Sequence, residues 1–186
     1  MMEYIGLSGK SGAGKTTLAV ALRDAYQPER AVVWGFGHEV KIEFILQYPD
    51  LAYSVEDLDS QHIKNIRLSK TQTIRDALIR IGLERRRKDP DYWLRRWLKR
   101  TKQMQQCGIH RVIAPDVRFE NEAQAIERLG GLLVRLTRNP VYIESDSDTL
   151  LDYYPFRYII DNACLTIDQS FDVLLKLVNR YFGGQI

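Results

Sequence analysis

Residues 3–26 read EYIGLSGKSGAGKTTLAVALRDAY, and this stretch decides the fold class. The run EYIGL (3–7) is typical of a short buried strand, and it leads directly into the glycine-rich segment GKSGAGKT (9–16). The residues that follow place apolar side chains at helical spacing, at Leu18, Ala21, Leu22 and Ala25. A strand, a glycine-rich turn and a helix in this order predict a loop that binds phosphate at the start of the helix.

This segment matches the pattern G-x-x-x-x-G-K-[ST] at Gly9, Gly14, Lys15 and Thr16. Glycines allow backbone conformations that turn several N–H groups toward one anion. Lys15 is expected to reach the β- and γ-phosphates of a nucleotide, and the Thr16 hydroxyl is expected to coordinate Mg²⁺ as the cofactor. The predicted nucleotide-binding residues of the loop are Gly9, Ser11, Gly12, Ala13, Gly14, Lys15, Thr16 and Thr17.

The rest of the chain alternates between strand and helix patterns. Strands are predicted at 31–36, 110–116, 132–138 and 156–161, and helices at 38–46, 119–131 and 169–182. Residues 49–60 have turn chemistry, with room for a short helix. The alternation predicts one α/β domain with a parallel sheet covered by helices on both faces.

A basic block lies between Lys64 and Lys102, where 14 Lys or Arg residues face four acids, a local balance of +10. Two helices are predicted here. One has an apolar stripe that ends near Gly82, and the other starts at Pro90 or Asp91 and carries Trp93, Leu94, Trp97 and Leu98 on one side. Such a block can hold a phosphorylated small molecule, contact nucleic acid, or solvate helix faces.

Several protein classes are disfavoured. No apolar run approaches the roughly 18 residues that span a bilayer, and the first residues do not resemble a secretory signal. The two cysteines, Cys107 and Cys164, are expected to be reduced and semi-buried, which favours a cytoplasmic protein. No NKxD stretch for guanine recognition occurs, so a GTPase is disfavoured and small kinases remain.

Further motifs carry a family resemblance. They are Arg75-x-x-Leu78-x-x-x-Gly82-x-Glu84-x-x-Arg87 with Asp91-x-Trp93, then Asp116-Val117-Arg118-Phe119-x-Asn121-Glu122-Ala123, then Gly130-Gly131 with Arg135 and Arg138, and finally Tyr154-Pro155-Phe156-x-Tyr158-Ile159-Ile160-x-Asn162. Together with the glycine-rich loop, and in this order over nearly the whole chain, they resemble the bacteriophage-type deoxynucleoside monophosphate kinases. The segment DVRFxNEA is the most specific part after the loop.

The resemblance implies transfer of the γ-phosphoryl group of ATP to a deoxynucleoside 5′-monophosphate. It implies a P-loop nucleoside monophosphate kinase fold, with an acceptor-binding helical region at about 38–106 and a lid at about 139–155. Asn162 belongs to the implied adenine side of the ATP site. The acceptor-binding candidates are Lys41, Arg75, Arg87, Trp93, Asp116 and Arg118, and the catalytic candidates are Lys15, Arg138 and Asp116. ATP and the monophosphate are the expected partners, without a membrane or a stable nucleic acid. A homodimer remains a possible oligomeric state. The expected location is the cytoplasm, which would be that of the host if the protein comes from a phage.

Individual residues have alternative interpretations. Arg138 either closes over the phosphates or forms a salt bridge at a strand end. Asp116 either orients Mg²⁺-bound water or the acceptor, or caps the following helix. Trp93 either stacks on the acceptor base or packs in the core, and Lys41 either touches the acceptor or is simply exposed.

Two other functions remain as alternatives. One is another small-molecule kinase of the same architecture, acting on dephospho-coenzyme A or on a sugar acid. The other is a nucleic-acid-stimulated ATPase that uses the basic helices on a phosphate backbone. The latter predicts affinity that falls steeply with salt, whereas the arginines interleave with an apolar stripe and form no continuous track.

Overall fold

The computed structural model describes residues 2–26, 30–138 and 149–183. The chain divides into two compact units, the first made of 1–35 and 100–186 and the second of 36–99. The family resemblance implied one domain with a helical region at about 38–106, and the second unit covers most of that region. The division falls inside a single helix, α5 (Tyr92–Gln106).

The first unit is built on a five-stranded sheet whose pairings are all parallel. The strand order is β2-β3-β1-β4-β5, which places the first strand in the centre. The strands are β1 (Glu3–Ser8), β2 (Ala31–Val33), β3 (Arg111–Val117), β4 (Leu132–Thr137) and β5 (Tyr158–Asp161). The predicted α/β class with a central parallel sheet is therefore confirmed.

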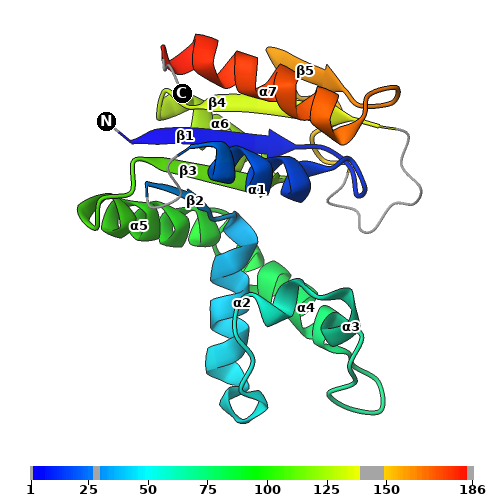
Figure 1. Cartoon of the computed structure of the whole chain (residues 1–186). Helices are drawn as coiled ribbons and strands as arrows, with labels where there is room; N and C mark the ends of the chain where they lie inside the picture. Colours follow the sequence, from blue (N-terminus) through cyan, green and yellow to red (C-terminus); the bar gives the residue numbers. More distant parts are fainter. Residues whose placement is uncertain (1, 27–29, 139–148, 184–186) are drawn as a thin grey trace. The chain divides into compact units, whose positions relative to one another are not determined.

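Helices cover both faces of this sheet. Figure 1 shows α1 (Lys15–Ala25) and α7 (Ile167–Phe182) on one face and α6 (Glu120–Arg128) on the other. Successive strand residues point to opposite faces, so Ile5 and Leu7 of β1 join the core under α1 and α7. Gly6 faces the other way, where a Cβ atom would lie 3.2 Å from Ile126 of α6. The alternation of side chains along β1 thus directs one face of the strand toward α1 and α7 and the other face toward α6.

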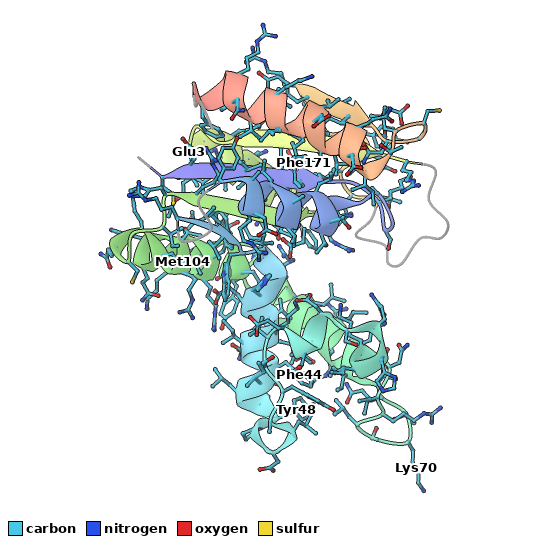
Figure 2. All side chains as sticks on the ribbon, viewed as in Figure 1. Glu3, Phe44, Tyr48, Lys70, Met104 and Phe171 are labelled. Atoms are coloured by element: carbon cyan, nitrogen blue, oxygen red, sulfur yellow. The ribbon has the colours of Figure 1, made fainter. Side chains whose placement is uncertain are left out.

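A large apolar cluster lies beneath α1 and α7. Phe171, labelled in Figure 2, packs against it in a partly buried position. Its fully or nearly fully buried members are Ile5, Leu7, Ala13, Leu18, Ala19, Leu22, Ile113, Leu132, Val134, Leu136, Ile160, Leu174 and Val178. Because Leu18, Ala19 and Leu22 anchor α1 in this core, the helix start is held rigidly at the end of β1.

Several boundaries differ from the sequence prediction. Strand β2 ends at Val33 instead of residue 36, because a helix begins at Phe36. Helix α7 starts at 167 instead of 169, since the Thr166 hydroxyl accepts a hydrogen bond from the backbone of Gln169 and caps the helix. Cys107 and Cys164 are exposed, and not semi-buried as expected.

The second unit is helical, with its own apolar core. It contains α2 (Phe36–Gln47), the short helices η1 (Pro49–Leu51), η2 (Asp57–Asp59) and α3 (Gln61–Lys64), α4 (Ile74–Lys88) and the first part of α5. The rings of Phe44 and Tyr48 stack at 4.7 Å between centroids (Figure 2). The core residues are Phe44, Leu58, Ile74, Ala77, Ile81 and Trp93. A short helix within 49–60 was predicted, and two occur.

Gly82 was predicted to lie close to the end of its helix, and the structure places it further inside. Helix α4 continues six residues further, to Lys88, and Gly82 lies in its interior with ordinary helical backbone. A glycine terminates a helix by adopting a left-handed conformation, which Gly82 does not have. Within the described residues, no helix is long and apolar enough to cross a membrane.

Candidate functional site

The glycine-rich loop (Gly9–Thr16) leaves the carboxyl end of the central strand. Ser8, the last residue of β1, is paired with Val117 of β3 on one side and with Arg135 of β4 on the other. The loop therefore begins close to the carboxyl ends of two neighbouring parallel strands, β3 and β4. In open parallel sheets, this carboxyl edge is where ligands bind.

Three glycines of the loop adopt positive φ angles, which residues with a Cβ atom rarely adopt. These are Gly9 (φ 146°), Gly12 (φ 78°) and Gly14 (φ 87°). A Cβ atom on Gly9 would lie 2.4 Å from the carbonyl oxygen of Leu136, whereas one on Gly12 would have no neighbour within 4 Å. Gly9 is therefore required by the protein's own backbone, while Gly12 borders open space.

The start of α1 suits an anion. Its N-cap is Gly14, no side chain caps it, and its first turn contains no acid. Helices α4 and α7 begin instead with complete capping boxes, at Thr73 and Thr166. The N–H groups in the first turn of α1 therefore donate no capping bond to a side chain at the N-cap. Together with the positive end of the helix dipole, they are directed at the loop.

Lys15 folds back over the loop. Its ammonium group donates to the carbonyl oxygens of Gly9 (2.6 Å) and Lys10 (2.8 Å), and the side chain is buried. Thr16 and Thr17 are exposed in the first turn of α1. The loop therefore combines a cation, backbone N–H groups and an accessible hydroxyl within a few residues.

Asn162, which the sequence assigned to the ATP site, contacts the loop directly. It follows β5 and is only 5% exposed. Its side-chain amide donates to the carbonyl oxygen of Ala13 (3.0 Å). Its own side-chain oxygen, Oδ1, is buried and has no hydrogen-bond partner within the described residues. Asn162 therefore contacts the glycine-rich loop, and its role on the adenine side of an ATP site stays a prediction.

Asp116 and Arg118 lie at the same edge of the sheet, on β3 and just after it. The alternative that Asp116 caps the following helix is wrong, because the N-cap of α6 is Phe119 and Glu122 completes its capping box. The Glu122 carboxylate accepts from the backbone N–H groups of Arg118 (3.0 Å) and Phe119 (3.1 Å). Asp116 packs instead on the backbone of Gly35, where a Cβ atom would lie within 2.2 Å of its Oδ1.

Arg138 follows β4 and is exposed. Most of the expected lid, residues 139–148 of 139–155, lies outside the described residues. Closure of Arg138 over bound phosphates therefore stays a prediction.

A second polar cluster at the loop was missed by sequence reasoning. Asp152 forms ion pairs with Lys10 of the loop and with Arg135 of β4, and Arg135 in turn donates to the Ser8 hydroxyl. These residues are far apart along the chain, and no spacing pattern connects them. Only the folding of β4 beside β1 brings them together.

The acceptor candidates of the second unit have different surroundings. Lys41 is buried and pairs with Asp59 at 2.5 Å, so the simple exposure considered for it is wrong. Arg75, at the start of α4, is half-buried and donates to the side-chain oxygen of Gln61. Arg87 is exposed near the end of α4. Their binding of an acceptor stays a prediction.

Trp93 is a core residue in this structure. It is completely buried in the second unit, and its indole N–H donates to the carbonyl oxygen of Gly82 at 3.0 Å. A ring enclosed in this way presents no face to a ligand. Stacking of Trp93 on an acceptor base is therefore wrong for this conformation, and the packing interpretation is confirmed.

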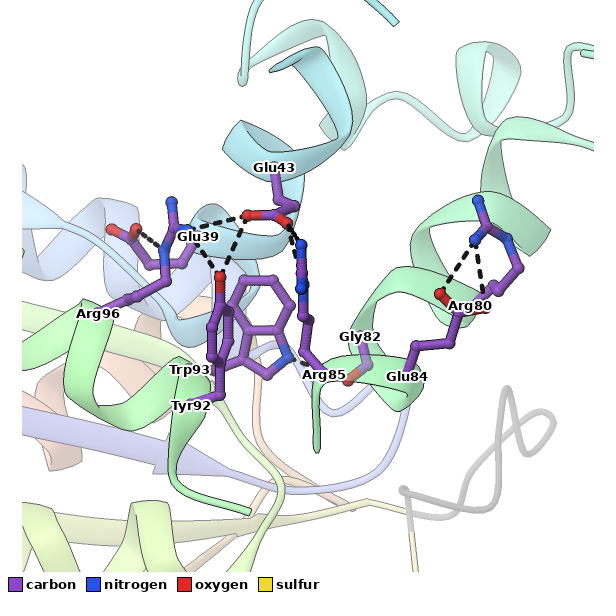
Figure 3. A network of polar contacts seen from close by, with 9 residues as sticks. All are labelled: Glu39, Glu43, Arg80, Gly82, Glu84, Arg85, Tyr92, Trp93 and Arg96. Atoms are coloured by element: carbon purple, nitrogen blue, oxygen red, sulfur yellow. Dashed lines mark hydrogen bonds and ion pairs between the residues drawn. The ribbon is translucent and has the colours of Figure 1, made fainter. Parts of the chain in front are cut away.

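Two buried carboxylates organise the basic block (Figure 3). Glu39 and Glu43 of α2 are only 2% and 7% exposed. Glu43 accepts from Arg85 (2.5 Å) and Arg96 (2.9 Å), and Arg96 also reaches Glu39 (3.3 Å). The hydrogen bond to Glu43 raises the pKa of the Arg85 guanidinium above its ordinary value. A buried carboxylate needs such partners, so these arginines serve the helical packing.

Comparison with known proteins adds little. No family model matches the chain, and no curated protein matches it. Among solved structures, the unliganded sugar kinase of Janibacter sp. HTCC2649 is similar at 15% identity with a TM-score of 0.44. That match covers 98% of this chain and 95% of the other. A likeness of this size supports no inference about activity.

Proposed function

We propose that the protein transfers the γ-phosphoryl group of ATP to a deoxynucleoside 5′-monophosphate. The observation that carries the donor half is the glycine-rich loop at the centre of the sheet. It joins three glycines at positive φ to Lys15 and to a helix start without a side-chain cap. The acceptor half rests on the family resemblance and on the basic second unit.

The donor site also accommodates Mg²⁺. Within the described residues, no cluster of three or more His, Cys, Asp or Glu side chains could hold a metal alone. Mg²⁺ keeps several waters and takes few protein ligands, so we expect it to arrive on the nucleotide phosphates. The exposed Thr16 hydroxyl would coordinate it, and the Asp116 carboxylate would orient its bound water or contact the acceptor. When bound, Mg²⁺ neutralises charge on the phosphates.

The acceptor side needs planar cations for a phosphate that carries about two negative charges. Arg75 and Arg87 of α4 meet this requirement, because guanidinium groups donate two parallel hydrogen bonds. Other arginines of the basic block form ion pairs within the second unit, namely Arg80, Arg85, Arg95 and Arg96. This internal pairing argues against a continuous track for nucleic acid.

The reaction requires positioning more than covalent catalysis. An oxygen of the acceptor phosphate attacks the γ-phosphorus, and the bond from the γ-phosphorus to the bridging oxygen breaks as ADP leaves. Lys15 stabilises the charge on the migrating group, and Arg138 is the candidate that closes over it. No enzyme-bound phosphoryl intermediate is needed.

An ADP-release assay over a substrate panel tests the proposal. The panel contains the four common deoxynucleoside monophosphates, dephospho-coenzyme A, gluconate and DNA, with Lys15→Ala as the catalytic control. We expect acceleration by at least one deoxynucleoside monophosphate and its loss in the variant. Acceleration by dephospho-coenzyme A or gluconate alone would identify another small-molecule kinase, and acceleration by DNA alone would identify a nucleic-acid-stimulated ATPase.

A further inference from the structure

Asp152 forms ion pairs with two cations, Lys10 of the glycine-rich loop and Arg135 of β4. One carboxylate oxygen lies 3.1 Å from the Lys10 ammonium, and the other lies 2.5 Å from the Arg135 guanidinium. The other arm of Arg135 donates to the Ser8 hydroxyl at 3.0 Å. Asp152 therefore holds Ser8 through Arg135 and Lys10 directly, so that it acts on both neighbours of Gly9.

Gly9 is the place where this restraint matters most. Its φ is 146°, and an added Cβ atom would meet the Leu136 carbonyl oxygen at 2.4 Å, so the turn has little room on that side. The Gly9 and Lys10 carbonyls also accept the hydrogen bonds of Lys15. A shift of this turn would therefore move Lys15, the predicted phosphate ligand, together with the loop.

The carboxylate is itself held in place. Leu151 beside it is buried, and the Asp152 N–H donates to the Thr149 carbonyl at 3.0 Å. Two residues later, the Tyr154 hydroxyl donates to Glu127 of α6 at 2.6 Å. Burial and this bond raise the pKa of Tyr154, which keeps its hydroxyl a donor. The turn around Asp152 is thus fastened to the sheet and to α6.

Arg135 depends on Asp152 for its charge balance. The residue is only 8% exposed, and its guanidinium lies 5.5 Å from the ring centre of Phe156. A buried cation without a counter-charge is strongly unfavourable. Loss of the carboxylate would therefore displace Arg135 and release Ser8.

We propose that Asp152 is a positioning residue for the donor nucleotide, acting through Arg135, Ser8 and Lys10 on the turn at Gly9. The ligand named here, a magnesium-bound adenine nucleotide, rests on the proposed function. In this role Asp152 would act only through these residues and would contact neither the nucleotide nor the reacting atoms. Its negative charge alone would weaken nucleotide binding, so the positioning role and a purely electrostatic role predict opposite effects of neutralising it.

The test compares Asp152→Asn with wild type, with Asp152→Glu and with Asp172→Asn, which removes an exposed carboxylate from α7. Calorimetry measures the Kd for magnesium-ADP well below the melting temperature. We expect Asp152→Asn to weaken binding about tenfold, as one lost charge-assisted contact would. Asp152→Glu should recover part of the affinity, and Asp172→Asn should change nothing.

Hydrogen–deuterium exchange of the nucleotide-free protein provides a second measurement. Amides of residues 9–13 should exchange faster in Asp152→Asn than in wild type or Asp172→Asn. Equal or tighter ADP binding by Asp152→Asn, or unchanged exchange in the loop, would overturn the proposal. A purely structural role would lower the melting temperature and leave the Kd unchanged. Neither measurement needs an acceptor, so a wild type that phosphorylates no deoxynucleotide refutes only the proposed function.

Discussion

Replacing Gly12 by alanine tests whether the open space in the glycine-rich loop is the phosphate site. Gly12 has a φ of 78°, and a Cβ atom there would meet no protein atom within 4 Å. Gly108 has a similar φ of 91° and equally open surroundings, but it lies in the turn between α5 and β3. Gly108→Ala therefore imposes the same backbone cost at a site without a predicted ligand.

The two substitutions should cost the fold similar amounts. A left-handed conformation costs an alanine about 1–2 kcal/mol, and the stiffer unfolded chain offsets about 0.4–1 kcal/mol of this. The net loss is about 1 kcal/mol for each, which lowers Tm by roughly 2–4 °C for a chain of this size. Gly9→Ala adds a clash with a strand carbonyl and should lose about 3–5 kcal/mol.

Binding should separate the two mild variants. A methyl group at Gly12 would occupy the space predicted for the phosphates. The affinity of Gly12→Ala for magnesium-ADP should therefore fall at least about tenfold, or about 1.4 kcal/mol. Gly108→Ala should bind as wild type does. Calorimetry gives the Kd, and thermal unfolding confirms that both variants have similar stability. Wild-type affinity in a folded Gly12→Ala protein would refute the assignment of this space to the phosphates.

The remaining predictions concern four other residues. Lys15→Ala should lower turnover at least about 100-fold, because it removes a cation from the reacting phosphates; initial rates at saturating substrate measure this, and a smaller loss would contradict the assigned role. Arg75→Ala should raise the acceptor KM or lower kcat with ADP affinity intact, and an unchanged acceptor profile would remove it from the site. Glu43→Gln should destabilise the fold by about 1–3 kcal/mol in urea unfolding, a figure reduced because its arginine partners are part-exposed. The hydrogen bonds from Thr73 lower the pKa of Asp76 below its ordinary 3.8. Since its folded pKa is depressed, Asp76 stabilises the protein above the ordinary value and loses this contribution as the pH falls through the folded pKa. Asp76→Asn should thus be less stable than wild type at pH 7, with a difference that shrinks below about pH 4; a difference independent of pH would argue against this linkage.

Local sequence predicted the elements well where their signals are local. The strand, loop and helix of residues 3–26 occur as β1, the glycine-rich loop and α1 within a residue or two. The predicted ends of strands and helices were wrong where contacts with distant residues determine them. The strand predicted at 31–36 ends early because Phe36 begins a helix and packs on Trp97, with 4.6 Å between ring centroids. Gly82 does not stop its helix, and its carbonyl instead accepts a hydrogen bond from Trp93.

The candidate site shows the same division. The glycine-rich loop could be located from the sequence because glycine, lysine and threonine occur at fixed spacing in one short segment, and its binding of phosphate stays a prediction. Trp93 could not be assigned, because an aromatic residue on an apolar stripe looks the same in the sequence whether it packs or binds. The sequence of the basic block likewise showed its net charge, but it did not show that Arg85 and Arg96 form ion pairs with Glu43.

By itself, the sequence determined the order of strands and helices and the position of the glycine-rich loop, because periodicity and backbone freedom are properties of neighbouring residues. Only the tertiary structure decided that β1 lies in the centre of the sheet, between β3 and β4. Because of that position, Arg135 of β4 donates a hydrogen bond to the Ser8 hydroxyl. Asp152, in a later turn, forms an ion pair with Lys10. Contacts between residues more than a hundred positions apart depend on strand order, which no local pattern records.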